Sequence, residues 1–245
     1  IYAPANFLAT VKKQLNLSLR FRVVENEDDV QAGQINVIDC GNSEFAYEPG
    51  QSTASGGKMA AASLEKSVAA LKSKKIAALV TAPINKSNMP KEDFPYPGHT
   101  EFLTEKLEAP NSLMFLVNDN LRVGLVTNHV PVSEVADKIS KQAILDTLNV
   151  MDKCLRRDFA IEKPLIAVLA LNPHAGDNGV IGDEDDKIIR PAILDAKKKG
   201  MMVVGPYPAD GFFGSGKQEK VDAILAMYHD QGLVPFKALS FGQGV

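Results

Sequence analysis

The sequence predicts an α/β fold, in which strands and helices alternate along the chain. Short apolar runs of strand length are separated by longer amphipathic stretches, and this alternation is typical of α/β domains. The chain has 245 residues, of which 45% are hydrophobic and 23% charged. That length and balance suit one large or two small globular domains with a substantial buried core.

The first predicted elements lie on the N-terminal side of a proline-rich segment. Residues Ala60–Lys74 are rich in Ala, Leu and Lys, which favour a helix. The apolar run Ile76–Thr81 is a predicted strand that Pro83 stops. The segment Pro83–Gly98 contains four prolines and little periodicity. We therefore expect a hinge there, between a first domain over residues 1–90 and a second over residues 91–245.

The elements of the second part follow from periodicity and capping residues. An amphipathic helix is predicted over Lys141–Arg157, with Ser140 as its N-cap. A second helix is predicted over Asp183–Lys199, because acidic residues occupy its first turn, lysines its last turn, and Gly200 follows. The predicted strands are Ser112–Val117, Arg122–Thr127, Leu165–Leu171, Met201–Val204 and Ala223–Met227, the first two joined by a turn at residues 118–120.

Charge and cysteine content exclude several classes of protein. The net charge of −3 provides no basic field for nucleic acid or an acidic membrane surface. Cys40 and Cys154 are too few for a disulfide scaffold and lack metal-site spacing, so we expect a reducing, cytoplasmic location. Apolar stretches such as Ile76–Val80 are far shorter than a membrane span, and no signal peptide is visible.

Three of the four histidines follow the ends of predicted strands. They are His129, His174 and His229, and strands of one parallel sheet would bring them to the same edge. Three imidazoles can bind a divalent transition metal and leave a position open for substrate or water. Any single histidine is more simply a hydrogen-bonded loop residue, but the shared context favours one metal site.

Acidic residues flank two of these histidines. Asp230 adjoins His229, and Asp177 lies shortly after His174. Either carboxylate could orient an imidazole that binds a metal. Turn formation explains Asp177 equally well, because Asp, Asn and Gly cluster around it.

Two further positions suit an anionic ligand. Gly98-His99-Thr100-Glu101 precedes an apolar-periodic stretch, and exposed amides at a helix start bind phosphate or carboxylate. Thr100 could equally be a simple helix cap, and both roles are compatible. Lys237 lies downstream of His229 and could neutralise a phosphate, although a lone lysine is more often a solvated surface group.

Several familiar nucleotide and nucleophile motifs are missing from the sequence. No Gly-x-Gly-x-x-Gly fingerprint occurs, and the glycines between Gly211 and Gly216 do not precede a helical pattern. A nucleophile elbow and a Walker phosphate-binding loop are also absent. A Rossmann cofactor site is therefore not supported by the motifs.

The strings around these residues resemble the 4-hydroxythreonine-4-phosphate dehydrogenase family of pyridoxal phosphate biosynthesis. They occur in the family's order and span most of the chain from about Leu79 onward, whereas residues 1–60 match only loosely. The most specific are the last string and the Asn-Pro-His-Ala-Gly string. The matching strings are residues 79–86 (LVTAPINK), 98–102 (GHTEF), 127–131 (TNHVP), 171–176 (LNPHAG), 208–210 (PAD) and 226–232 (AMYHDQG).

The resemblance implies a fold like that of isocitrate and isopropylmalate dehydrogenases, with two α/β domains flanking a cleft. It places the metal site and a dimer interface in the second domain, within a homodimer whose active site is shared. We expect both chain ends to lie inside a longer family sequence, because Ile1 opens within an apolar pattern and Val245 follows no terminating helix. The missing parts would be an N-terminal glycine-rich start and a C-terminal return to the first domain with further substrate contacts.

The resemblance also implies roles for individual residues. The metal ligands would be His129, His174 and His229, and the ion would be Zn, Mg or Co. Substrate contacts would be His99, Thr100 and Lys237, and Lys237 would also act in catalysis. Asp210 is a weaker candidate for a catalytic proton acceptor in the neighbouring subunit's site, since it could also be a turn residue before Gly211.

The expected activity is the oxidation of 4-phosphooxy-L-threonine with NAD or NADP, followed by decarboxylation of the 3-oxo acid to 3-amino-2-oxopropyl phosphate. One alternative is a dehydrogenase of a phosphorylated sugar acid, such as threonate or erythronate 4-phosphate. Another is a metal-dependent hydrolase of a phosphorylated metabolite, because three histidines and an activated water suit that chemistry too. A silent metal-binding relative is disfavoured by the presence of His99, Thr100 and Lys237 beside the three histidines.

Overall fold

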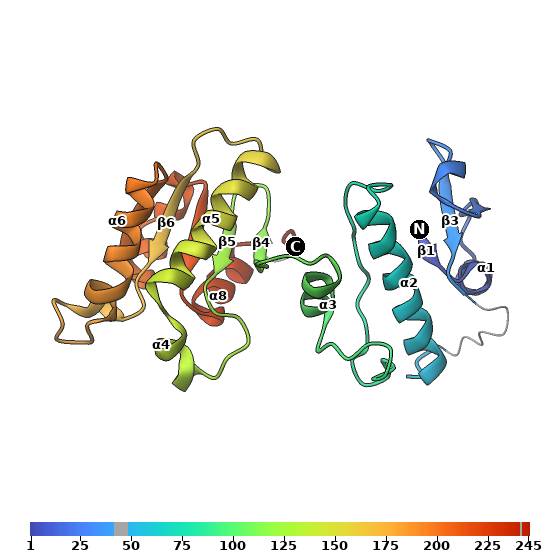
Figure 1. The fold of residues 1–245 in the computed structure, drawn as a ribbon, viewed down its shortest axis with the longest axis horizontal. Helices are drawn as coiled ribbons and strands as arrows, with labels where there is room; N and C mark the ends of the chain where they lie inside the picture. The colour runs from blue at the N-terminus through green and yellow to red at the C-terminus, as the bar shows by residue number, and fades with distance from the viewer. Residues whose placement is uncertain (42–48, 241) are drawn as a thin grey trace. The chain divides into compact units, whose positions relative to one another are not determined.

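The chain folds into two compact units in the computed structural model, which describes residues 1–41, 49–240 and 242–245. Unit 1 spans Ile1–Pro110 and unit 2 spans Asn111–Val245 (Figure 1). The units divide at residue 110, whereas the sequence placed the domain boundary at residue 90. The difference arises because residues 91–110 pack within unit 1.

Unit 1 contains a parallel sheet with the strand order β1-β3-β2, formed by β1 (Tyr2–Ala3), β2 (Phe21–Val24) and β3 (Ile35–Asp39). Helix α1 (Ala5–Gln14) follows β1 along the chain and precedes β2. The long helix α2 (Ala54–Lys72) begins at Thr53, whose side-chain oxygen accepts the Gly56 N–H at 3.1 Å. The predicted helix over Ala60–Lys74 is therefore confirmed, but it begins earlier because a cap outweighs the poor helix propensity of two glycines.

The proline-rich segment belongs to unit 1 instead of forming a hinge between the units, because its Met89 and Phe94 pack in one hydrophobic cluster with residues of α2. Phe94 is 2% exposed, and its ring centroid lies 4.9 Å from that of Phe102 in α3 (His99–Lys106). The ring of Tyr96 meets both rings edge-on, with centroid distances of 5.2 Å to Phe94 and 5.3 Å to Phe102. Burial of these aromatic rings holds residues 83–98 within unit 1.

The predicted strand Ile76–Thr81 is wrong. No strand is present over these residues, and Val80 is 94% exposed. An apolar run forms a strand only when a neighbouring strand supplies hydrogen bonds. Among the described residues, none pairs with this run.

Unit 2 contains a five-stranded sheet with the order β4-β5-β8-β6-β7. Its strands β5, β8, β6 and β7 are parallel, and β4 pairs antiparallel with β5. All five predicted strands are confirmed with adjusted ends, and the observed bounds are β4 (Phe115–Val117), β5 (Arg122–Leu125), β6 (Leu165–Leu169), β7 (Met202–Tyr207) and β8 (Ala223–Ala226). Asn118 closes the predicted β4–β5 turn, because its side chain accepts the N–H of Leu121 at 2.6 Å.

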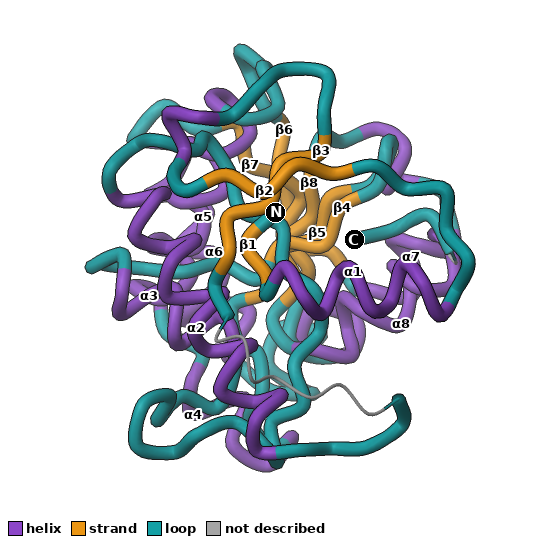
Figure 2. Tube along the Cα trace, turned by 90° about the vertical axis from the view of Figure 1, so that its right-hand side faces the viewer, coloured by secondary structure: helices purple, strands orange, loops and turns teal. Residues whose placement is uncertain are grey.

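Alternate residues of the central strands bury opposite faces of this sheet. Ile166 and Val168 of β6 pack in one cluster with α5 (Lys141–Arg157) and α6 (Arg190–Lys198). Ala167 and Leu169 pack in a second cluster with α7 (Ala209–Gly214) and α8 (His229–Ser240). Helices thus cover both faces, as parallel sheets require, and Figure 2 distinguishes helices from strands by colour.

The helices of unit 2 agree closely with prediction in one case and only partly in another. Helix α5 spans the predicted residues, and Ser140 caps it by accepting the Ala143 N–H at 3.1 Å. The predicted helix over Asp183–Lys199 contains a π turn at Asp185–Ile189 before α6. The short α4 (Val135–Lys138), α7 and α8 were not predicted. Among the described residues, no helix is long and apolar enough to cross a membrane.

Candidate functional site

The strands that precede the three predicted histidines are neighbours in the sheet of unit 2. Strand β8 lies between β5 and β6, and all three run parallel. Their carboxyl ends therefore share one edge of the sheet, where ligands of open α/β sheets bind. His129, His229 and His174 follow β5, β8 and β6 respectively. The predicted placement of these residues at one sheet edge is confirmed.

His129 and His229 lie close enough to bind the same ion. Their ring centroids are 5.6 Å apart. A metal about 2.1 Å from each ring nitrogen lies about 3.2 Å from each centroid, so two imidazoles in tetrahedral geometry have centroids about 5.2 Å apart. The observed separation fits this arrangement. His229 Nδ1 is 2.7 Å from Asp230 Oδ1, which leaves Nε2 for a ligand and matches the orienting role expected of Asp230.

His174 lies on an unusual loop after β6. Every residue from His174 to Gly179 has a positive φ, between 43° and 90°. This conformation costs a residue with a side chain about 1–2 kcal/mol, and such backbones occur where the surroundings hold them for function. A side chain at Gly176 is not possible, because its β-carbon would lie 2.5 Å from the Gly182 carbonyl oxygen.

A buried carboxylate holds the start of this loop. Asp185 is 0% exposed, and its oxygens accept the backbone N–H of Leu171 at 2.9 Å and of Asn172 at 3.0 Å. The Asn172 side-chain amide donates to Asp185 at 3.1 Å and to Glu184 at 2.7 Å. Sequence analysis missed Asp185, because it lies among ordinary helix-start acids. Asp177, by contrast, contributes a turn: it has φ 43°, and its N–H donates to His174 O at 3.3 Å.

One copy of the chain does not assemble the complete predicted metal centre. Within the described residues, no group of three or more His, Cys, Asp or Glu side chains could hold a metal ion. The structure therefore brings His129 and His229 together and leaves His174 outside their reach. Since both His129 and His174 are exposed, a second copy of the chain has access to them.

In unit 1, His99 and Thr100 form the first turn of α3. The N-cap of this helix is Gly98, not Thr100, and no side chain caps it. Buried His99 Nε2 has no hydrogen-bond partner among the described residues. The pKa of His99 is lowered, first by burial and then by the positive charge of Lys86. His99 is thus biased toward its neutral form, with a ring nitrogen available to a ligand.

Lys86 is a residue that sequence reasoning overlooked, although it ends the matched string at residues 79–86. A β-carbon built on Gly98 would lie 3.6 Å from Lys86 Nζ and 3.4 Å from Glu101 Oε2, so the lysine shares this position with a carboxylate. The ammonium group therefore lies beside the start of α3, where the helix N–H groups are unpaired. A cation at that end of a helix is normally unfavourable, but it suits a site that receives an anion.

The other two predicted residues are exposed on helices of unit 2. Lys237 lies in the last turn of α8, which begins with His229, so the two residues are about 12 Å apart along the helix axis. Asp210 lies in the first turn of α7, where a carboxylate is favourable even without a catalytic role.

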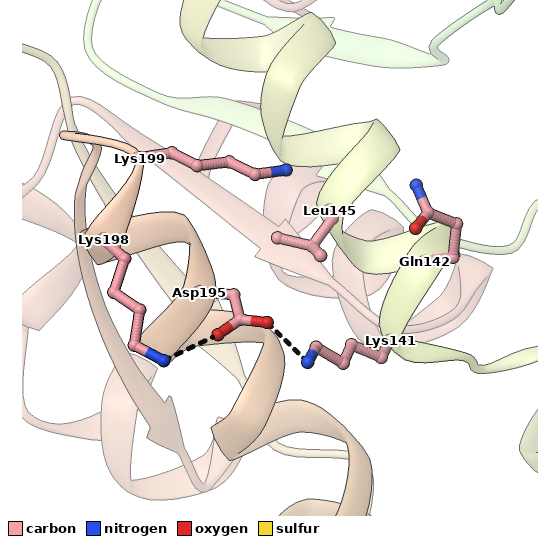
Figure 3. A pocket seen from close by; sticks show the side chains of 6 residues that line it. All are labelled: Lys141, Gln142, Leu145, Asp195, Lys198 and Lys199. Atoms are coloured by element: carbon pink, nitrogen blue, oxygen red, sulfur yellow. Dashed lines mark hydrogen bonds and ion pairs between the residues drawn. The ribbon is translucent and has the colours of Figure 1, made fainter.

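Two surface pockets lie away from all of these residues. One, of about 580 Å³, is lined by Lys141, Gln142, Leu145, Asp195, Lys198 and Lys199 (Figure 3). Asp195 pairs with Lys141 and, at 3.2 Å, with Lys198; hydrogen bonds from both lysines lower its pKa. The other, of about 710 Å³, is lined by residues of unit 1 around α1, including Lys12, Lys13 and Arg20. Neither pocket contains a predicted site residue.

The fold and the histidines at one sheet edge define a two-unit α/β protein with a candidate metal site, and comparisons specify its family. Residues 1–245 match the family described as pyridoxal phosphate biosynthetic protein PdxA. The 4-hydroxythreonine-4-phosphate dehydrogenase of Bacteroides thetaiotaomicron is 43% identical over 246 residues, covering 100% of this chain and 68% of the relative. The enzyme of that name from Prosthecochloris aestuarii is 38% identical over 250 residues, covering 100% of this chain and 74% of the relative.

Solved structures agree with this assignment. The crystal structure of 4-hydroxythreonine-4-phosphate dehydrogenase from Klebsiella pneumoniae matches with a TM-score of 0.88 and 33% identity, over 99% of this chain and 76% of that one. A terephthalate 1,2-cis-dihydrodiol dehydrogenase from Burkholderia xenovorans, 22% identical with a TM-score of 0.68, shares the fold over 96% of this chain and 72% of that one. The chain therefore belongs to the PdxA family and has its isocitrate-dehydrogenase-like fold.

Proposed function

We propose that this chain is a metal-dependent, NAD(P)-linked dehydrogenase that oxidises 4-phosphooxy-L-threonine to the 3-oxo acid, which then loses carbon dioxide to give 3-amino-2-oxopropyl phosphate. The observation that carries the proposal is the set of three histidines that follow adjacent parallel strands in a member of the PdxA family. No observation of the molecule favours the sugar-acid or hydrolase alternatives.

The metal site is proposed to be shared by two copies of the chain. His129 and His229 of one copy have the separation of two ligands on one ion, and His174 of a second copy would complete the set. Imidazole suits Zn²⁺ or Co²⁺ better than Mg²⁺, which prefers oxygen ligands, so this donor set favours Zn or Co. When bound, the ion would supply Lewis-acid stabilisation of negative charge on the substrate oxygen.

The substrate phosphate is proposed to bind at the start of α3. Among the described residues His99 Nε2 has no hydrogen-bond partner, the N–H groups of the first turn have no carbonyl partner within the helix, and Lys86 supplies a positive charge beside Gly98. A phosphate dianion needs several such donors. Family resemblance adds Lys237 as a further contact and as a catalytic group. The nicotinamide cofactor would bind without a Gly-x-Gly-x-x-Gly motif, and we assign no residue to it.

An absorbance assay of NAD or NADP reduction tests the activity. We expect reduction with 4-phosphooxy-L-threonine, its loss after treatment with a chelator, and its return with Zn²⁺ or Co²⁺. Faster reduction with phosphorylated sugar acids would move the assignment to that alternative. Release of inorganic phosphate without any reduction of the cofactor would contradict the dehydrogenase and favour the hydrolase.

Mixing of inactive variants tests the shared site. In a mixed dimer of His129→Ala and His174→Ala chains, one metal site carries both lesions and the other carries neither, so activity should partly return. A mixture of His129→Ala with His229→Ala is the matched control, because each site then keeps one lesion and should stay inactive. If neither mixture recovers although subunits exchange, the three histidines belong to one chain's site.

The same design tests the weaker role of Asp210. If this carboxylate serves as a proton acceptor in the neighbour's site, Asp210→Asn mixed with His129→Ala should recover activity. Recovery would assign the two residues to opposite chains. A fully active Asp210→Asn homodimer would show that Asp210 has no catalytic role beyond its position at the start of α7.

We also propose a cytoplasmic location. The two free cysteines, Cys40 and Cys154, support it, because a reducing compartment keeps thiols unpaired.

A further inference from the structure

Backbone hydrogen bonds between the strands that precede the histidines extend further on one side of β8 than on the other. On the β5 side of β8, backbone bonds continue to the Thr127 N–H, which donates to Met227 O at 3.1 Å. On the β6 side, the last paired residues are Val168 and Leu225. Beyond that pair, the backbone ladder no longer sets the spacing between the β6 and β8 ends.

The side chain of Gln231 fills this gap. Its carbonyl oxygen accepts the Met227 N–H at 2.7 Å, and its NH₂ group donates to the Ala170 carbonyl at 2.6 Å. The orientation of the amide is determined, because a backbone N–H can only donate and a backbone carbonyl can only accept. The Gln231 amide thus takes the place of a peptide unit between the ends of two strands.

These bonds lie close to the histidines in the chain and join two buried residues through the partly buried Gln231 side chain. Met227 and Ala170 are 0% and 1% exposed, so an unmade bond at either would be costly. Met227 precedes His229 by two positions, and Ala170 precedes His174 by four. Thr127, two positions before His129, adds a side-chain bond to Met227 O at 2.8 Å. Met227 is therefore tied through its N–H and its carbonyl to both neighbouring strand ends.

We propose that Gln231 is a positioning residue that sets the separation between the strand ends carrying His174 and His229, and through Met227 keeps His229 in place for metal binding. The inference rests on the proposed function only in taking these histidines as metal ligands. No other side chain of this length both accepts and donates as the site requires: Glu cannot donate when ionised, and Met cannot donate and accepts only weakly. Asn is one methylene shorter and would not span the two strand ends.

The test compares metal binding by full-length variants. Metal-free Gln231→Met and Gln231→Glu are titrated with Co²⁺ and followed by visible absorption. We expect the dissociation constant to rise about tenfold or more, as for other losses of groups that support metal ligands, and the absorption bands to shift because the ligand geometry changes. Gln142→Glu is the matched control, since this side chain is exposed and, among the described residues, bonds to Asp146 alone, and it should bind Co²⁺ like the wild type.

Hydrogen exchange of the metal-free protein provides an independent readout. If Gln231 fixes the strand end, Gln231→Met should speed exchange of the Met227 N–H while leaving the Leu225 N–H within the sheet unchanged. A role in general stability would speed exchange at both. Gln231→Met introduces no charge, so both measurements can still be made on this variant if Gln231→Glu does not fold.

Two results would overturn the proposal. One is a Gln231→Met variant with wild-type Co²⁺ affinity and spectrum, in a protein whose binding is abolished by His129→Ala. The other is unchanged exchange of the Met227 N–H. If His129→Ala binds Co²⁺ like the wild type, the proposed metal site fails by itself, and the exchange measurement alone decides the role of Gln231.

Discussion

Replacement of Asp185 by Asn tests how the left-handed loop that carries His174 is held in place. The two carboxylate oxygens of Asp185 accept the backbone N–H groups of Leu171 and Asn172 in a site with 0% exposure. In Asp185→Asn, one oxygen becomes an NH₂ group that faces a backbone N–H, so one partly buried donor loses its acceptor. A bond to a charged group contributes about 1.5–3 kcal/mol, and an unpaired buried donor costs about 1–3 kcal/mol. We expect a local loss of about 3 kcal/mol.

Amide hydrogen exchange measures this loss where it occurs. Since 1.4 kcal/mol corresponds to a factor of ten, the Leu171 and Asn172 amides should exchange about 100-fold faster in Asp185→Asn. Asp186→Asn is the control, because Asp186 forms an exposed ion pair with Arg190 at 3.0 Å, and such pairs contribute about 0–1 kcal/mol. A change of less than about threefold in Asp185→Asn would refute the argument that the carboxylate holds the loop.

Four further predictions concern other parts of the molecule. Lys86→Ala and Lys237→Ala should each raise KM for the phosphorylated substrate about tenfold or more, with KM for NAD unchanged; equal effects on both constants would make these lysines structural. NMR titration from about pH 5 to 8 should show a His99 pKa below its usual value that moves back upward in Lys86→Ala, because the repelling charge is removed. The pKa of His99 is lower in the folded state than in the unfolded state, so the folded state binds fewer protons. The free energy of unfolding should therefore fall as the pH drops below about 6.5. In urea unfolding, His99→Gln should make this fall smaller. Leu148→Ala, at a site with 0% exposure in α5, should lower the free energy of unfolding by about 3–5 kcal/mol, whereas Leu194→Ala, at 52% exposure, should cost less than about 1 kcal/mol.

The parts of the fold that could be predicted are those determined by local patterns. Helix α5 has the predicted bounds, because its apolar stripe and its Ser140 cap are both written within its own residues. The run Ile76–Thr81 has equally good strand composition, yet it forms no strand. Strand formation depends on a partner, and the sequence of the run contains no information about one.

The candidate site shows the same division. The sequence alone was enough to single out His129, His174 and His229, because each follows a short apolar run that becomes a strand of the same sheet. It could not show that Lys86 lies beside Gly98, since twelve positions of irregular, proline-containing chain separate them. Irregular segments have no period from which a spatial neighbour could be predicted.

The sequence by itself determined the chemistry at the strand ends. It showed which strands are followed by imidazoles, and which residues can cap a helix, form a turn or donate a hydrogen bond. Only the tertiary structure decided their spacing. Strand β8 lies between β5 and β6, although it is the last of the three along the chain, and Gln231 bonds to Ala170 across 61 positions. Such contacts depend on how strands pair and helices pack around a common core, which is settled by the burial of the whole chain and not by any local pattern.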